Sequence, residues 1–134
     1  MNMIRRSLRG VVASGSANGR QVSVEFLWQR RHPLMVHAAY SMPGAESWII
    51  GRDLLADGLR GKSGEGSVTV APGPGGSGLL LTVRGAGGSL TVFFPGGVTD
   101  MGIFLAATYQ EVPRHHDIAA DLDRELARIF RDTA

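Results

Sequence analysis

The sequence contains no cysteine, and this absence excludes several kinds of chemistry. It removes disulfide frameworks, thiolate metal sites and cysteine nucleophiles, and it fits a reducing compartment such as the cytoplasm. No apolar run approaches the roughly 20 residues that a membrane-spanning helix needs. The N-terminus has early arginines, but the apolar stretch and processing site of a secretory signal do not follow them. We therefore expect a soluble, cytoplasmic protein that is not exported.

The sequence also lacks a strong excess of either charge, because 14 basic residues against 12 acidic residues give a formal net charge of +2. The charges are nevertheless uneven, since residues 1–31 contain six arginines and Glu25 as the single acid. A basic N-terminal part can contact nucleic acid, anionic lipid or an acidic protein, although a solvated face is the simpler interpretation. Residues 1–134 are expected to form a single domain that is large enough to bury a core.

Alternating apolar residues predict that much of the chain is β-sheet. The clearest case is residues 21–28, in which all four even-numbered positions are apolar and indicate a strand with one buried face. Strands are predicted at residues 3–13, 21–28, 34–41, 48–50, 67–71, 79–84 and 89–94, and helices at residues 52–59, 98–109 and 117–130. The glycine-rich turns suit short antiparallel connections. The predicted fold class is therefore α+β, with a mainly antiparallel sheet, a short helix in mid-chain and two C-terminal helices.

Three motifs that resemble catalytic or ligand-binding sites lack the surroundings that such sites need. Residues 73–78 match G-x-G-x-x-G, but a strand follows instead of a helix whose N-terminus would hold a pyrophosphate. Residues 61–63 resemble the end of a phosphate loop without its preceding glycine. Residues 115–117 (His-His-Asp) have no further ligand at metal spacing, and His37 is expected on the exposed face of its strand. We therefore expect no enzyme, no metal and no cofactor.

Residues 48–59 (WIIGRDLLADGL) combine an apolar strand with about two turns of helix. The helix begins with Arg52 and Asp53, which we interpret as a cap and an ion pair that anchor the helix, in preference to a role in partner contact. Gly58 stands near the end of the helix, where a glycine in the left-handed conformation would stop it.

The two tryptophans raise the question of nucleic-acid binding, because aromatic side chains on a sheet can stack on bases. Trp48 lies in an apolar strand and is expected to pack in the core. Trp28 is followed by Gln29, Arg30 and Arg31. This combination of aromatic and basic residues leaves a single-stranded nucleic-acid-binding protein as the alternative hypothesis.

Three segments together resemble the SsgA-like proteins, the actinobacterial family of sporulation-linked cell-division proteins. Residues 33–40 (PLMVHAAY) are similar to the family's P-Y-A-V-x-x-x-F strand, residues 48–59 to its W-x-F-x-R-D-L-L-x-x-G motif, and residues 112–126 to its closing V-P and D-x-D-x-E-L segment. The second segment is the most specific, and the resemblance covers about residues 10–130. The residues that match this motif are Trp48, Arg52, Asp53, Leu54, Leu55 and Gly58.

The chain departs from the family pattern in one place. Residues 29–32 read Gln-Arg-Arg-His, where the family has an acidic loop before the proline. The candidate partner-contact residues are therefore Trp28, Arg30, Arg31 and His32.

The resemblance implies a non-enzymatic protein that marks or controls septum sites in sporulating actinobacteria. Its implied partners are the tubulin-like GTPase FtsZ, a paralogous SsgA-like protein, and further copies of itself in a homotrimer. Its implied fold is a twisted antiparallel sheet with helices, similar to that of Whirly and mitochondrial guide-RNA-binding proteins. Its implied location is the cell septum.

Overall fold

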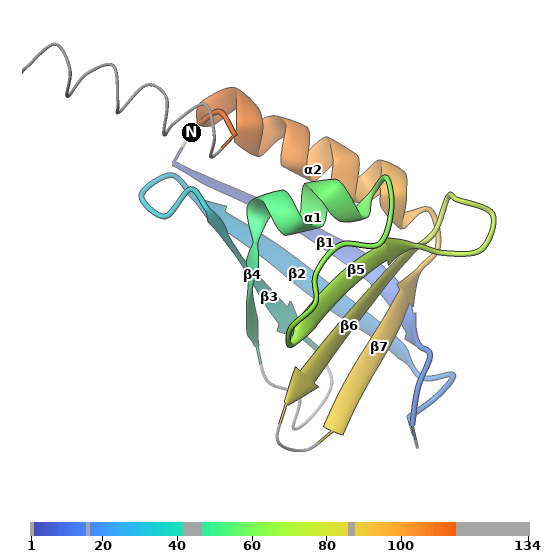
Figure 1. Ribbon diagram of the computed structural model, residues 1–134. Coiled ribbons are helices and arrows are strands. Elements are labelled where there is room, and N and C mark those ends of the chain that lie inside the picture. The colour runs from blue at the N-terminus through green and yellow to red at the C-terminus, as the bar shows by residue number, and fades with distance from the viewer. Residues whose placement is uncertain (1, 16, 42–46, 86–87, 115–134) are drawn as a thin grey trace, which may run out of the picture.

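The computed structural model describes residues 2–15, 17–41, 47–85 and 88–114. Within these ranges, seven strands form one antiparallel sheet in the order β4-β3-β2-β1-β7-β6-β5, accompanied by two helices (Figure 1). The strands are β1 (Met3–Val12), β2 (Gln21–Gln29), β3 (Met35–Tyr40), β4 (Trp48–Gly51), β5 (Val68–Pro72), β6 (Leu79–Gly85) and β7 (Gly88–Phe94). The helices are α1 (Arg52–Gly58) and α2 (Gly97–Glu111).

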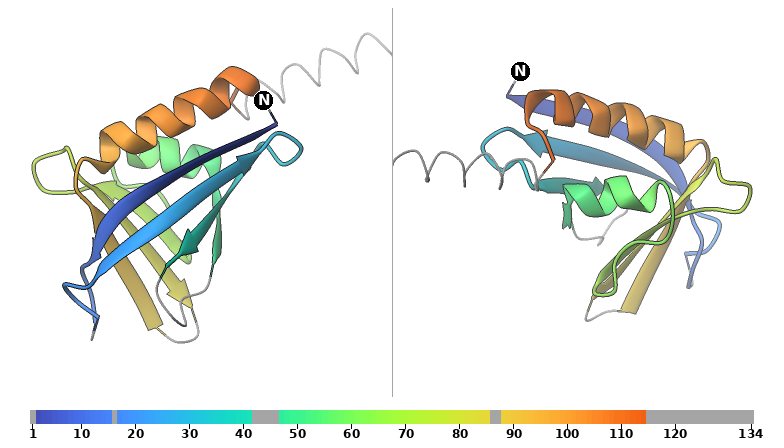
Figure 2. Two further views of the ribbon diagram at one scale, coloured as in Figure 1. Left: turned by 180° about the vertical axis from the view of Figure 1, so that it is seen from behind. Right: turned by 45° about the horizontal axis from the view of Figure 1, so that its top comes forward.

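The sheet bends where its two halves meet, between β1 and β7. These strands pair only at Val11 with Phe93 and Val12 with Val92, whereas β1 pairs with β2 along most of its length. Gly10 allows the close approach, because a Cβ there would lie 2.6 Å from a methyl carbon of Val92. Figure 2 shows that both helices lie on the concave side of the bent sheet.

The core fills the space between the concave face and the helices. The buried residues of α2 recur at the spacing of a helix with one apolar face, and the largest of them are Met101, Phe104 and Leu105. Phe26 of β2 lies with its ring centroid 6.0 Å from that of Phe94 on β7 and 6.3 Å from that of Phe104 on α2. These three rings therefore join the two halves of the sheet to the longer helix.

The structure confirms the predicted α+β class, the mainly antiparallel sheet and the short helix in mid-chain. The boundaries of the seven strands and two helices described above differ from the predicted ones by at most two residues at each end. The third predicted helix, at residues 117–130, lies outside the described residues.

Candidate protein-interaction surface

The strand β4 continues directly into α1 at Gly51, and this junction fixes the position of Arg52. Gly51 has an extended conformation (φ −61°, ψ 132°), and the backbone N–H of Arg52 still donates to the carbonyl oxygen of Leu34 at 2.9 Å, as the next rung of the β3–β4 ladder. The sheet thus holds the backbone of Arg52, while its side chain is completely buried.

The Arg52 guanidinium binds the C-terminal end of α2. Its Nη1 donates to the carbonyl oxygens of Thr108 at 3.3 Å and Val112 at 2.8 Å, and its Nη2 donates to that of Pro113 at 2.7 Å. The carbonyl oxygens of Val112 and Pro113 lie just beyond the helix, where intrahelical donors run out, whereas that of Thr108 also accepts from the backbone N–H of Val112 at 3.0 Å. α2 has no basic residue of its own in its last turn, so Arg52 supplies the positive charge that favours a helix C-terminus.

Aromatic rings enclose the same guanidinium. Its central carbon lies 4.2 Å from the ring centroid of Tyr109 and 5.9 Å from that of Trp28. Burial lowers the pKa of Arg52, while the charge of Asp53 opposes this shift. Because an arginine pKa starts above 12, the side chain stays protonated at physiological pH.

Asp53 contacts the same end of α2 from the first turn of α1. Its carboxylate accepts a hydrogen bond from the Tyr109 hydroxyl at 2.5 Å and lies 3.9 Å from Nε of Arg114. Nη2 of Arg114 donates to a carboxylate oxygen of Asp57 at 3.0 Å. Burial and the bond to Asp53 raise the pKa of Tyr109, so that its hydroxyl remains a donor. We call Arg52, Asp53, Tyr109 and Arg114 the α1–α2 clamp.

The clamp corrects our interpretation of Arg52 and Asp53 as a cap and an ion pair of α1. Gly51 occupies the N-cap position of α1, with no capping bond from a side chain. The Arg52 and Asp53 side chains instead bond to groups on α2 or just beyond it. The reason is geometric, because β4 and α1 place both residues opposite the end of α2. The two residues anchor one helix to the other.

The remaining motif residues support α1 by packing. Leu55 is fully buried, and Leu54 and Trp48 pack against the core. Gly58 is not in the left-handed conformation that we expected, since the described residues with positive φ do not include it. A Cβ at Gly58 would lie 2.3 Å from a methyl carbon of Val70, so the glycine is needed because α1 lies against β5.

The position of Trp28 contradicts the prediction that this residue contacts a partner. Its side chain is fully buried, and its Nε1 donates to the carbonyl oxygen of Pro33 at 3.0 Å. The alternating pattern of β2 places it on the same face as Val24 and Phe26, toward the core. A buried ring cannot stack on a base, so the main sequence argument for nucleic-acid binding is lost.

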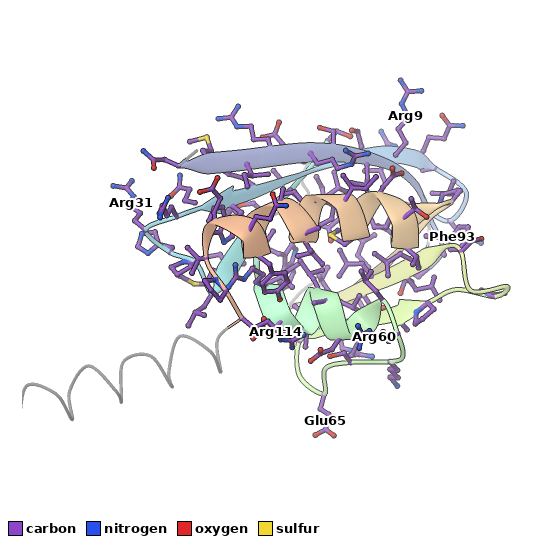
Figure 3. The ribbon with its side chains drawn as sticks, turned by 90° about the horizontal axis from the view of Figure 1, so that it is seen from above. Arg9, Arg31, Arg60, Glu65, Phe93 and Arg114 are labelled. Carbon is purple, nitrogen blue, oxygen red and sulfur yellow. The ribbon has the colours of Figure 1, made fainter. Side chains whose placement is uncertain are left out.

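The other three candidate partner-contact residues form an exposed basic turn between β2 and β3. Arg30, Arg31 and His32 are all exposed. Arg30 Nη1 lies 3.2 Å from a carboxylate oxygen of Glu111, which ties the turn to the end of α2. The Arg31 side chain points away from the body of the molecule in Figure 3. The turn is therefore a charged protrusion held in place at its base.

An exposed apolar patch beside this turn escaped the sequence analysis. It lies on the convex face of β2, β3 and β4, where Leu27, Met35 and Ile49 line a depression of about 350 Å³ together with Gln29, His32 and His37. Ile49 is 64% exposed and Met35 is 43% exposed. We call these six residues the outer patch. Strand alternation could have revealed this patch, because it places the Ile49 side chain on the other face of the sheet from those of Trp48 and Ile50.

The part of the chain that the structure describes contains neither a metal-binding cluster nor a membrane-spanning helix. No three histidine or acidic side chains there are grouped to hold a metal ion. The His-His-Asp sequence at 115–117 lies outside that part. No helix among the described ranges is long and apolar enough to cross a bilayer.

Comparison with known proteins agrees with the resemblance seen in the sequence. The sequence pattern of the family described as "Streptomyces sporulation and cell division protein, SsgA" matches residues 22–117. The sporulation-specific cell division protein SsgB of Saccharopolyspora erythraea is 31% identical over 112 residues, which cover 81% of this chain and 79% of that protein.

Two solved structures share the fold. One is SsgB, from work on mutations that correlate with longitudinal cell division during sporulation of Streptomyces coelicolor; it has a TM-score of 0.73 and 26% identity, over 84% of this chain and 91% of that one. The other is an SsgA-like sporulation-specific cell division protein of Thermobifida fusca, with a TM-score of 0.73 and 22% identity over 94% of both chains. The match of the family pattern to most of the sequence shows that the chain belongs to the SsgA family of sporulation and cell division proteins.

Proposed function

We propose that this protein is a non-enzymatic cell-division regulator that helps to select or mark the septum site during sporulation. In this proposal it acts at the septum by recruiting or positioning FtsZ, alone or with a paralogous SsgA-like protein. The observation that supports the proposal is the family match over residues 22–117, which includes the complete clamp. The further likeness to Whirly and guide-RNA-binding proteins, and the homotrimer, belong to the same proposal.

The basic turn is the surface that best suits a partner contact. Arg30, Arg31 and His32 project at one end of the molecule, and the bond from Arg30 to Glu111 orders the turn before any partner binds. Opposite charges on two surfaces increase association rates and specificity. We therefore propose that the turn meets an acidic region of the partner.

Co-sedimentation with FtsZ filaments tests this proposal, because a bound protein is found in the pellet. The wild type should sediment with the filaments, and Arg31→Glu should weaken binding by about tenfold, as expected for one reversed charge at an interface (about 1.4 kcal/mol). Arg20→Glu is the matched control, because Arg20 is also exposed but lies in the turn before β2. It should leave binding unchanged.

Localisation in sporulating cells provides an independent readout. A fluorescent fusion should gather at septa, and deletion of the gene should disturb septum placement. A folded protein that neither sediments with FtsZ nor gathers at septa would exclude the proposed function. Equal effects of Arg31→Glu and Arg20→Glu would retain a binding function but reject the basic turn as its site.

A further inference from the structure

We propose that the outer patch is a docking site for the C-terminal segment of the same chain, residues 117–130. This inference does not depend on FtsZ. It follows from an exposed apolar surface, from the point at which the chain leaves the described structure, and from the sequence of the segment that continues from there.

The outer patch is unusual for an exposed surface. Leu27, Met35 and Ile49 come from three adjacent strands, and the strand register places Leu27 opposite His37 and His37 opposite Ile49. Their side chains therefore form one continuous strip across the sheet. Exposed side chains of this size, gathered in one depression, usually mark a surface that another segment or molecule covers.

The clamp directs the chain toward this patch. Arg52 binds the carbonyl oxygen of Pro113 through its side chain and that of Leu34 through its backbone N–H. Leu34 directly precedes Met35, which pairs with Gly51. The chain thus leaves the described structure beside the end of β3 and β4 that carries the patch, although on the opposite side of the sheet.

The path around the sheet passes a single edge strand. β4 is the last strand in the sheet order, so the chain passes one edge to reach the convex face. Three extended residues span about 10 Å, which is comparable to the thickness of one sheet layer. Residues 114–117 are therefore long enough to make the crossing, and the helix predicted at residues 117–130 would extend about 20 Å.

The sequence of the segment matches the patch in polarity. The apolar residues at helical spacing are Ile118, Leu122, Leu126, Ile129 and Phe130. At that spacing Asp121 and Glu125 border the apolar stripe. The margin of the patch carries His32 and His37 and the exposed Arg5, which pairs with Leu27 in the register of β1 and β2. An apolar stripe bordered by acidic residues therefore matches an apolar strip with the positive charge of Arg5 at its margin.

The absence of cysteine makes this inference directly testable by thiol labelling. A single Met35→Cys variant of the full chain reports access to the patch. Its labelling rate should rise about tenfold when Leu122→Asp and Leu126→Asp are added, because the charged stripe can no longer cover the patch. Ser23→Cys is the control, because Ser23 lies on the same face of β2 but at its other end, and its rate should not change.

Cross-linking identifies which chain supplies the segment. A bifunctional thiol reagent should join Met35→Cys to Leu122→Cys within one chain at high dilution, and should not join Ser23→Cys to Leu122→Cys. Links that form only between two chains would overturn the proposal and assign the patch to a second copy. An unchanged labelling rate in the aspartate variant, with circular dichroism showing a folded protein, would overturn docking altogether.

Discussion

At the scale of the residue, Arg52 is the side chain on which most contacts converge. It joins the start of α1 to the end of α2 through three carbonyl oxygens and one aromatic ring within 4.2 Å. A lysine at this position would present one compact ammonium group, which cannot reproduce the planar arrangement of two separated donors over a ring. The motif therefore requires arginine for its shape as well as for its charge.

Arg52→Ala is expected to lower the free energy of unfolding by about 3–5 kcal/mol, because it removes a large buried side chain and the donors to the carbonyl oxygens of Val112 and Pro113. Arg52→Lys should cost about 2 kcal/mol or more. Urea denaturation measures both, and Arg60→Ala is the control because Arg60 is exposed. A change below 0.5 kcal/mol for Arg52→Lys would show that charge alone is sufficient.

The two tyrosines of the chain predict a loss of stability at alkaline pH. Burial raises the pKa of both Tyr40 and Tyr109 in the folded state, so each phenol ionises more readily after unfolding. The contribution of the two neutral phenols to the free energy of unfolding is fully present below the ordinary tyrosine pKa of about 10. It is lost as the pH rises above that value. Each can lower the free energy of unfolding by at most about 1.4 kcal/mol per pH unit in that range.

Denaturant titrations between pH 9 and 12, with phenolate absorbance as a second signal, measure this loss. Tyr109→Phe should make the decline with pH clearly shallower, and Tyr40→Phe should do the same independently. A slope that neither substitution changes would mean that other groups control alkaline unfolding.

At the scale of the element, the position of α1 depends on its last residue. α1 contacts β5 more extensively than β4 or α2, and Gly58 is the point of closest approach to Val70. A helix this short is not stable by itself, so tertiary packing determines whether it forms. The clamp holds the first turn of α1 and the contact with β5 holds the last turn.

The sign of the stability change in Gly58→Ala tests whether packing against Val70 explains the glycine at this position. In a helix free of other contacts, alanine would be more stable than glycine by about 1 kcal/mol. Here the added Cβ meets the backbone-proximal atoms of Val70, and we expect a loss of about 1–3 kcal/mol. Thermal or urea unfolding measures the change, and Val70→Ala combined with Gly58→Ala should cost less than the sum of the two single substitutions, because Val70→Ala removes the nearest methyl carbon. A stabilised Gly58→Ala variant would contradict the packing explanation.

At the scale of the whole molecule, the two edges of the sheet differ. Ser63 covers part of the β5 edge through two backbone hydrogen bonds with Val70, at 2.8 and 2.9 Å. The β4 edge has no such cover among the described residues, and it carries the exposed Ile49. Unpaired apolar strand edges tend to associate with other chains. Because the β4 and β5 edges differ, they suit an assembly in which one surface of a subunit contacts a different surface of the next.

The proposed homotrimer predicts a native mass of about three times 14.3 kDa. Light scattering coupled to size-exclusion chromatography should give this value over a range of concentrations. Ile49→Lys should leave the mass unchanged if residues 117–130 of the same chain cover the outer patch, because Ile49 would then not lie between subunits. A monomeric mass for the wild type would exclude the trimer.

The sequence allowed accurate prediction of the strands because alternation reports which residues face a core. The same alternation already placed Trp28 on the buried face of β2, and its neighbours Arg30 and Arg31 led to the wrong functional interpretation. The exposed basic turn was predictable, because consecutive charged residues next to a proline cannot be buried. The outer patch is not evident from the sequence, because Ile49 lies between the apolar residues Trp48 and Ile50 in a continuous apolar run.

The amino-acid sequence alone therefore determined the elements, their order and the family motif, because these depend on local periodicity and residue type. The tertiary structure decided what the motif does. Arg52 and Asp53 are 56 residues or more from the partners they bind on α2, and Gly58 is constrained by a strand that follows it. Contacts between residues so far apart in the chain depend on how the bent sheet brings β4, α1 and α2 together, and no local pattern contains that information.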